Sequence, residues 1–453
     1  MMAEYQPLIA TGAGVFALLV LILWARMNAF VALILVAVLS AVAAGMPPEK
    51  ALDTVVAGMG GTLGFIAVVI GLGALFGAML EASGGVTALA NRLLHNRSVG
   101  AGRWAMSLIG FLASIPVFFD VALIILAPLV FAAARRAGRP AMTFGLPLLA
   151  GLGVAHSFIP PTPGPMAVAG IIGADLGWMI LYGAAVGVVA AALAGPIFAA
   201  ALDRMKAMPA GCADETEAAA QETAPVMGAG AAAAIIVLPL LLILGGTLTK
   251  TLIAADAAGA AGLLRHAFAL AGHPFIALII ACGGALLFFR GGSQAQKDRL
   301  SRALSKALEP TGAVILVTGA GGAFKQVLVE TGAGGQLAEA ALSFGMTPIL
   351  AAYVLTLLIR VAQGSATVAM ITGAGLVAPF AQAAGHTAQE LALVALACAA
   401  GAAALSHVND SGFWLVSRIF GLTPKETLKT WTVTATIASL AGFAGVSVIA
   451  FVT

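Results

Sequence analysis

Long apolar segments recur from one end of the chain to the other, separated by short polar stretches. Each is close to the length that a helix needs to cross roughly 30 Å of hydrocarbon in a bilayer. The pattern therefore predicts an all-α polytopic membrane protein. The clearest segments are Leu8–Leu23, Ala29–Gly45, Trp178–Ala201, Gly228–Leu244, Phe275–Phe289 and Trp431–Val452.

The composition agrees with this prediction. Of 453 residues, 61% are hydrophobic and only 9% are charged, and the mean hydropathy is +1.05. A soluble domain has about 25% charged residues, so we expect no separate soluble domain and no nucleic-acid surface; the partner is the lipid bilayer. No Lys or Arg precedes Arg26, so the first segment lacks the basic start of a cleavable signal peptide and is expected to be retained.

The three cysteines, Cys212, Cys282 and Cys398, are scattered and have no metal-ligand spacing. We interpret them as small core residues. The sequence predicts neither a metal site nor a cofactor.

A single shift aligns the chain with itself. Phe76 corresponds to Phe324, a separation of 324 − 76 = 248 residues, and the same shift carries Gly164 to Gly412. We therefore predict two repeats. The expected divisions are a first repeat at 1–201, a cytoplasmic linker at 202–227, a second repeat at 228–453 and, within it, a basic amphipathic helix at 291–309.

The distribution of charge predicts that the repeats have inverted topology. The stretch around Pro116 is too long for one crossing and too short for two, which favours a re-entrant helical hairpin. Its flanks are rich in arginine, including Arg97 and Arg135, and are expected to be cytoplasmic. The corresponding hairpin around Gln363 has acidic flanks, including Glu390, and is expected to open outward.

Each repeat also contains a membrane helix interrupted by polar residues. The interruptions lie at 156–165 and 406–412, where "HSFIPPTPGP" and "SHVNDSG" break the apolar pattern. A broken helix leaves free N–H and C=O groups that can bind ions near the bilayer midplane. The backbone residues assigned to the hairpin tips and helix breaks are Pro116, Pro161, Gly164, Gly364 and Gly412.

Polar side chains at these interruptions are candidates for ligand binding. They could hydrogen-bond a polyhydroxylated ligand or only cap the half-helices. Arg360 could neutralise a substrate carboxylate or pair with Asp120 or Asp410, and Lys325 could be a second cation or a snorkelling residue. The candidates for substrate binding are Thr162, Arg360, Ser365, Thr367, Asn409 and Ser411.

Ionisable residues within the membrane are candidates for proton coupling, because an isolated charge there is costly. A buried carboxyl group holds a proton more readily than an exposed one, which makes Asp120 the preferred carrier. The histidines have the alternative of a purely structural role. The full set is Asp120, His156, His407 and Asp410.

Several long motifs resemble one family. The chain is similar from end to end to the gluconate:proton symporter (gluconate permease) family, through "FFDVALIILAPLVF", "AHSFIPPTPGPMAVA", "GGAFKQVLVETG", "GSATVAMITGAGLVAP" and "SHVNDSGFWL". The resemblance implies proton-coupled import of gluconate or a related sugar acid across a bacterial inner membrane, an elevator-type mechanism and a homodimer.

Two departures from the family pattern leave the substrate open. Relatives commonly have "FFE" where this chain has Asp120 as the acid, and "PPHPGP" where it has Thr162 in place of the His. The family also handles hexuronates and D-serine, so these substrates stay as alternatives.

Other classes of function are disfavoured by the sequence. It has no HExxH, no GxSxG and no metal-ligand cluster, which argues against a membrane-embedded hydrolase. A channel would need a polar lining along its full depth, whereas the polar residues here gather at four interruptions.

Overall fold

The computed structural model describes residues 6–95, 97–209, 225–254, 259–333, 336, 345–383, 385–408 and 410–453. These residues form helices and connecting turns, without a strand among them. Seven helices in the described part are long and apolar enough to cross a membrane, or eight if the bent pair α12–α13 counts as one span. The predicted all-α polytopic architecture is confirmed.

The first half of the chain contains ten α-helices. They are α1 (Gln6–Leu23), α2 (Ala29–Ala43), α3 (Pro48–Ser83), α4 (Gly85–Leu94), α5 (Val99–Ser114), α6 (Phe119–Ala137), α7 (Met142–Phe158), α8 (Pro163–Ile172), α9 (Leu176–Ala192) and α10 (Phe198–Arg204). A π-helical segment at Leu193–Ile197 joins α9 to α10.

The second half of the chain also consists of helices and connecting turns. Its described helices are α11 (Ala229–Leu252), α12 (Gly259–Ala271), α13 (Pro274–Leu287), α14 (Gln294–Ala307), α15 (Glu309–Glu330), α17 (Pro348–Gln363), α18 (Ala366–Ala383), α19 (Ala388–Ala403), α20 (Ser411–Ile419), α21 (Pro424–Thr427) and α22 (Val433–Val452). A π-helical segment at Leu428–Thr432 joins α21 to α22.

The helix bounds repeat at the spacing found in the sequence. Adding 248 to the bounds of α5 gives 347–362, and α17 occupies Pro348–Gln363. The same addition takes α8 to 411–420, where α20 occupies Ser411–Ile419. The long helix α3 corresponds to α14 and α15 together. The predicted limits of the linker stay predictions: α10 runs past residue 201 to Arg204, and residues 210–224 lie outside the described residues.

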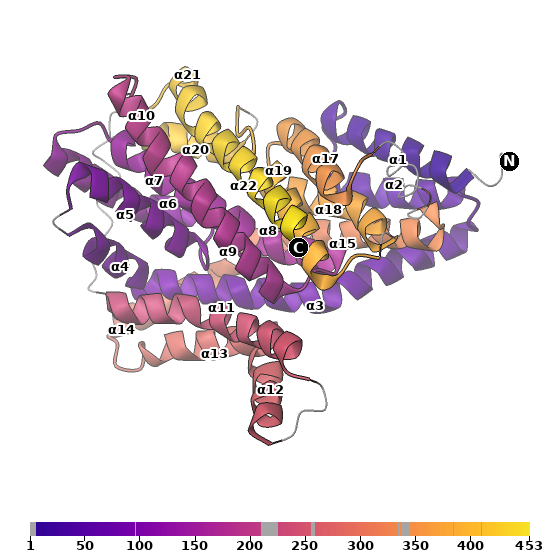
Figure 1. Ribbon diagram of the computed structural model, residues 1–453, viewed down its shortest axis with the longest axis horizontal. Helices are drawn as coiled ribbons and strands as arrows, with labels where there is room; N and C mark the ends of the chain where they lie inside the picture. The colour runs from indigo at the N-terminus through magenta and orange to yellow at the C-terminus, as the bar shows by residue number, and fades with distance from the viewer. Residues whose placement is uncertain are drawn as a thin grey trace.

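The two hairpins lie toward opposite ends of the molecule. Figure 1 shows α5 and α6 at one end and α17 and α18 at the other, with α8 and α19 between them. The first hairpin turns at Ile115–Phe118, and the second turns at Gly364 and Ser365. Gly364 has φ +81, a left-handed conformation that only glycine adopts without strain. The predicted inverted repeats with re-entrant hairpins therefore describe the fold.

Both helix breaks are shifted from their predicted positions. Helix α7 continues through His156 and ends at Phe158, and α8 already begins at Pro163. Proline is tolerated in a first turn because the N–H that it lacks would have no partner there. Gly164 and Gly412 were assigned to the breaks, but both lie within first turns, of α8 and α20. This corrects their assignment. Gly164 instead makes room for a neighbour, since a Cβ there would lie 3.0 Å from Met370 Cε.

Helix α3 packs tightly against the interior of the fold. A Cβ at Gly77 would lie 2.1 Å from the Pro116 carbonyl oxygen, and one at Gly73 would lie 3.1 Å from the Pro161 carbonyl oxygen. The small residues of α3 thus permit close backbone approach, as is usual between membrane helices. One helix contacts both the first hairpin tip and the break between α7 and α8.

The basic helix predicted at 291–309 is α14. It begins with a capping box in which Ser293 and Gln296 bond each other's backbone N–H groups. None of its residues is buried, but Arg299 Nη2 donates to the Glu81 carbonyl oxygen at 3.2 Å. The helix therefore packs along the end of α3.

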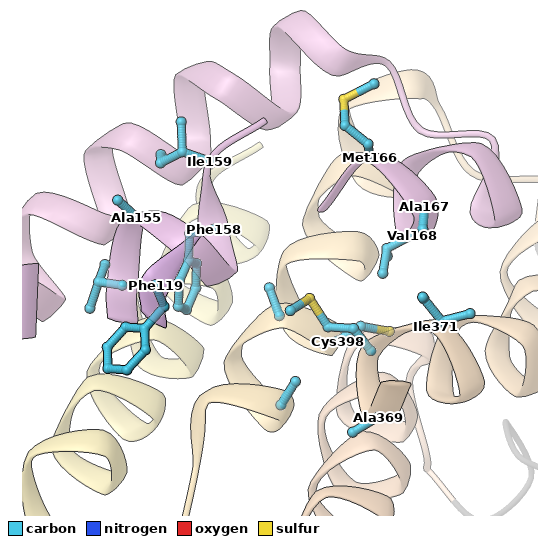
Figure 2. Close-up of a cluster of buried hydrophobic side chains, with 14 of the residues drawn as sticks. Phe119, Ala155, Phe158, Ile159, Met166, Ala167, Val168, Ala369, Ile371 and Cys398 are labelled. Carbon is cyan, nitrogen blue, oxygen red and sulfur yellow. The ribbon is translucent and has the colours of Figure 1, made fainter. Parts of the chain in front are cut away.

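The apolar core lies between the hairpins and the broken helices. Figure 2 shows side chains from α6, α7, α8, α18 and α19 in one buried cluster, including Phe119, Phe158, Met166, Ile371 and Cys398. Cys282 and Cys398 are buried free thiols, and Cys212 lies outside the described residues. The core joins segments far apart in the sequence and so fixes the polar interruptions relative to one another.

Candidate substrate-binding site

A cavity of about 200 Å³ lies where the second hairpin tip meets both repeats. This volume is below the range of about 300–1,000 Å³ that is typical for drug-sized ligands, which favours a small substrate. Many of its lining residues are candidates from the sequence, namely Asp120, His156, Arg360, Ser365, Thr367, Asp410, Ser411 and Gly412.

Helix ends converge on this cavity. Its lining includes the first residues of α6, α18 and α20 and the last turns of α7 and α19. The start of α6 has no side-chain cap. Helix starts carry partial positive charge and unpaired N–H groups, so the arrangement favours an anion.

Arg360 and Asp410 form a buried ion pair beside the cavity. Arg360 Nη2 lies 2.5 Å from Asp410 Oδ2, and 4% and 12% of the two side chains are exposed. The guanidinium also donates from Nε to the Ala404 carbonyl oxygen at 3.2 Å and from Nη1 to the Gly364 carbonyl oxygen. Of the alternatives left open for Arg360, the structure shows pairing with Asp410.

Asp410 is bonded on both oxygens. Oδ2 also accepts from Ser406 Oγ at 2.5 Å, and Oδ1 accepts from the Gly412 N–H at 2.9 Å, which caps α20. Ser406 Oγ in turn accepts from Trp431 Nε1 at 2.7 Å. This network joins the second hairpin, the break before α20 and the segment leading into α22.

Asp120 has a different environment. It lies in the first turn of α6, is exposed, and lines the cavity. Among the described residues it has neither an ion-pair nor a hydrogen-bond partner. Of the two carboxylates that line this cavity, Asp120 is therefore the one without a partner among the described residues.

Two buried polar atoms of residues lining the cavity lack a protein partner in the described part of the chain. They are His156 Nδ1 and Thr434 Oγ1. Buried polar atoms are normally hydrogen-bonded, so each unpaired one requires an explanation. Trp431 and Thr434 were not among the predicted site residues. The signal for Trp431 was the segment "TLKTWTV", which follows the last polar interruption, and Thr434 lies directly after this segment.

The other candidates that the structure describes do not line the cavity. Thr162 Oγ1 donates to the Ile159 carbonyl oxygen at 2.6 Å, and His407 Nε2 lies 2.8 Å from the Val361 carbonyl oxygen. Lys325 lines a separate cavity with Thr62 and Gln326. Asn409 lies outside the described residues. Pro116, Pro161, Gly164 and Gly364 are also not among the residues that line the cavity.

The described residues contain no group of three or more His, Cys, Asp or Glu side chains placed to hold a metal ion.

A family model described as GntP family permease matches residues 6–452. The chain belongs to the GntP permease family. It is 40% identical over 433 residues to a gluconate permease of Pseudomonas aeruginosa, covering 94% of each chain. It is 37% identical over 445 residues to a low-affinity gluconate transporter of Escherichia coli, covering 98% of each.

The fold is also similar to that of a solved transporter structure. The crystal structure of the Alcanivorax borkumensis YdaH transporter matches with a TM-score of 0.62 at 18% identity, covering 89% of this chain and 88% of that one. At this identity the likeness shows the fold alone. The family and the apolar helices together make this chain a multi-pass transporter of the bacterial inner membrane and not an enzyme.

Proposed function

We propose that this GntP permease imports gluconate or a closely related sugar acid together with a proton. The main support is the cavity, in which helix starts, hydroxyl groups and one unpaired carboxylate meet in a member of a family with named gluconate transporters. A sugar acid has one carboxylate and several hydroxyls, which matches these groups in kind.

The substrate carboxylate binds at the helix starts in this proposal. The uncapped first turn of α6 and the backbone N–H groups near Ala366 and Thr367 supply donors. Arg360 has five N–H groups and uses three in its bonds to Asp410, Ala404 and Gly364, so two remain for a ligand. Arg360 thus holds the hairpin tip and contributes to binding secondarily.

The substrate hydroxyls bind the polar side chains on the cavity wall. His156 Nδ1 and Thr434 Oγ1 would gain the partners that they lack in the described protein. Thr367 and Ser411 line the same space, and their hydroxyls make no hydrogen bond to another described residue. A ligand that satisfied these atoms would remove the cost of leaving them unpaired.

Asp120 carries the coupled proton in this proposal. It faces the same cavity as Asp410, and Asp410 is occupied by Arg360, Ser406 and the Gly412 N–H. A proton on Asp120 removes one negative charge from the cavity before the anionic substrate enters. Proton and substrate binding therefore favour each other.

We further propose an elevator-type movement within a homodimer, as the family resemblance implies. The Arg360–Asp410 pair bonds the second hairpin to the start of α20, so these elements move as one unit. The hairpins and broken helices would carry the cavity from one side of the membrane to the other.

Uptake by the purified protein in liposomes tests the proposal. With excess unlabelled gluconate inside and labelled gluconate outside, we expect the label to accumulate transiently above its equilibrium level. A channel does not produce such counterflow, and an enzyme would not leave the substrate chemically unchanged. An inward proton gradient should then drive accumulation at a clamped membrane potential. If D-serine or a hexuronate is exchanged but gluconate is not, the proposed substrate is wrong. If gluconate accumulates without a proton gradient, the proposed proton coupling is wrong.

A further inference from the structure

Two cavities meet at the base of the first hairpin, away from the substrate site. The first, which we name the basic pocket, has a volume of about 740 Å³ and lies between α4, α5 and α6. Its polar lining contains no acidic side chain among the described residues. The polar residues are Thr87, Asn91, His95, Arg97, Ser98 and Arg136.

The second cavity is an apolar groove of about 510 Å³ along the outer side of α5. Trp104, Leu108 and Phe111 of α5 line it, and Val188 of α9 closes its other side. Trp104 is 53% exposed. Arg97 lines both cavities, so the apolar groove begins where the basic pocket ends.

The arginines around the basic pocket divide into two kinds. Arg103 and Arg139 bind Asp203 at 2.7 and 3.4 Å, and their charges are thereby compensated. Arg97 and Arg136 are exposed and form no ion pair with another described residue. These two guanidinium groups lie next to an apolar groove, and their positive charge is available to an anionic ligand.

We propose that the basic pocket and the apolar groove together bind one anionic phospholipid. Its phosphate lies between Arg97 and Arg136, because guanidinium groups match phosphate oxygens in geometry and charge. One acyl chain lies in the groove along Trp104 and Leu108. A free phosphate compound would use the pocket but not the groove, so the groove identifies the ligand as a lipid.

Charge and placement both support this ligand. Basic residues at the membrane end of helices attract anionic headgroups, and basic pockets between membrane helices bind them. The basic pocket is lined by α4 and by both arms of the first hairpin. A bound lipid therefore contacts all three helices and stabilises the base of the hairpin.

Thermal unfolding of the purified full chain in neutral detergent tests the assignment. Added phosphatidylglycerol should raise the unfolding temperature by several degrees, because a ligand that binds the native state stabilises it. Phosphatidylcholine and glycerol 3-phosphate should have little effect. The variant Arg97→Gln/Arg136→Gln should lose most of the shift. The matched control is Arg92→Gln/Arg135→Gln, which removes two exposed arginines outside both cavities and should keep it.

Quenching of Trp104 fluorescence gives a second readout that does not depend on stability. The Trp104 signal is the difference between the wild type and Trp104→Phe. In liposomes, phosphatidylglycerol with brominated chains should quench it at least twofold more than brominated phosphatidylcholine at the same mole fraction, and Arg97→Gln/Arg136→Gln should abolish the preference. Equal quenching by the two lipids, or a full thermal shift with glycerol 3-phosphate alone, would overturn the proposal.

Discussion

Arg360 and Asp410 lie in different polar interruptions of the sequence, yet their side chains meet at 2.5 Å in the interior of the protein. The pair joins the last turn of α17 to the residue that caps α20. A charged side chain in the membrane needs a partner of opposite charge or a ligand, and here each supplies the other. The second hairpin and the second broken helix are consequently one structural unit.

Breaking this pair should destabilise the fold. We expect Arg360→Gln and Asp410→Asn each to lower the free energy of unfolding by about 3–5 kcal/mol, since each leaves a buried charge without its partner. The double variant should lose less than the sum of the two. Denaturant unfolding of the purified protein measures all three, with Arg135→Gln as an exposed control. Additive losses would show that the two residues are not coupled.

Asp120→Asn should separate exchange from accumulation. The amide resembles a protonated carboxyl group but does not titrate, so gluconate exchange should continue while proton-driven accumulation is lost. Liposome uptake at a clamped membrane potential measures both. Asp53→Asn, at an exposed position near the start of α3, is the control and should behave as the wild type. Normal accumulation by Asp120→Asn would show that another residue carries the proton, and His156 would be tested next.

The hydroxyl groups of Ser411 and Thr434 should contribute directly to affinity. Losing one hydrogen bond costs about 0.5–1.5 kcal/mol, so Ser411→Ala and Thr434→Val should each weaken gluconate binding roughly 2- to 12-fold. Calorimetric titration of the purified protein gives the dissociation constants. Thr162→Val serves as the contrast, because Thr162 bonds the Ile159 carbonyl away from the cavity and should change stability only. If all three variants weaken gluconate binding equally, the cavity is not the binding site.

Gly77→Ala should disturb the contact between α3 and the first hairpin. The added methyl group would lie 2.1 Å from the Pro116 carbonyl oxygen, so backbone must shift, and overpacking of this kind costs typically about 1–3 kcal/mol. We expect a lower unfolding temperature and slower transport. Gly60→Ala lies on the same helix with nothing within 4 Å of the new atom and should be tolerated. If the two variants behave alike, the close contact between α3 and the first hairpin is not required for stability or transport.

The bases of the two hairpins should lie on opposite sides of the membrane. In a cysteine-free background, Arg135→Cys places a thiol at an exposed site at the base of the first hairpin, and Ala383→Cys places one at the base of the second. A membrane-impermeant maleimide should label Ala383→Cys in intact cells and Arg135→Cys only in inverted vesicles. Labelling of both variants from the same side would contradict the predicted orientation of the hairpins.

The amino-acid sequence by itself determined the architecture. The apolar segments, the shift of 248 residues and the reversed arginine bias predicted membrane helices in two inverted repeats, and the polar interruptions placed the hairpin tips. These features are local or periodic, because membrane helices must satisfy their backbone within each segment. The sequence predicted the exact positions of the helix breaks less accurately. The prolines at 163 and 165 suggested continued disruption, but the first turn of a helix accepts them.

Only the tertiary structure decided which polar side chains meet. Arg360 pairs with Asp410 and not with Asp120, and Thr162 turns to its own backbone away from the cavity. Trp431 and Thr434 join the site from a helix at the far end of the chain. The physical reason is that a side chain's partners depend on how helices distant in sequence pack together, and that packing is fixed by the shared core of α6, α7, α8, α18 and α19 rather than by any local pattern.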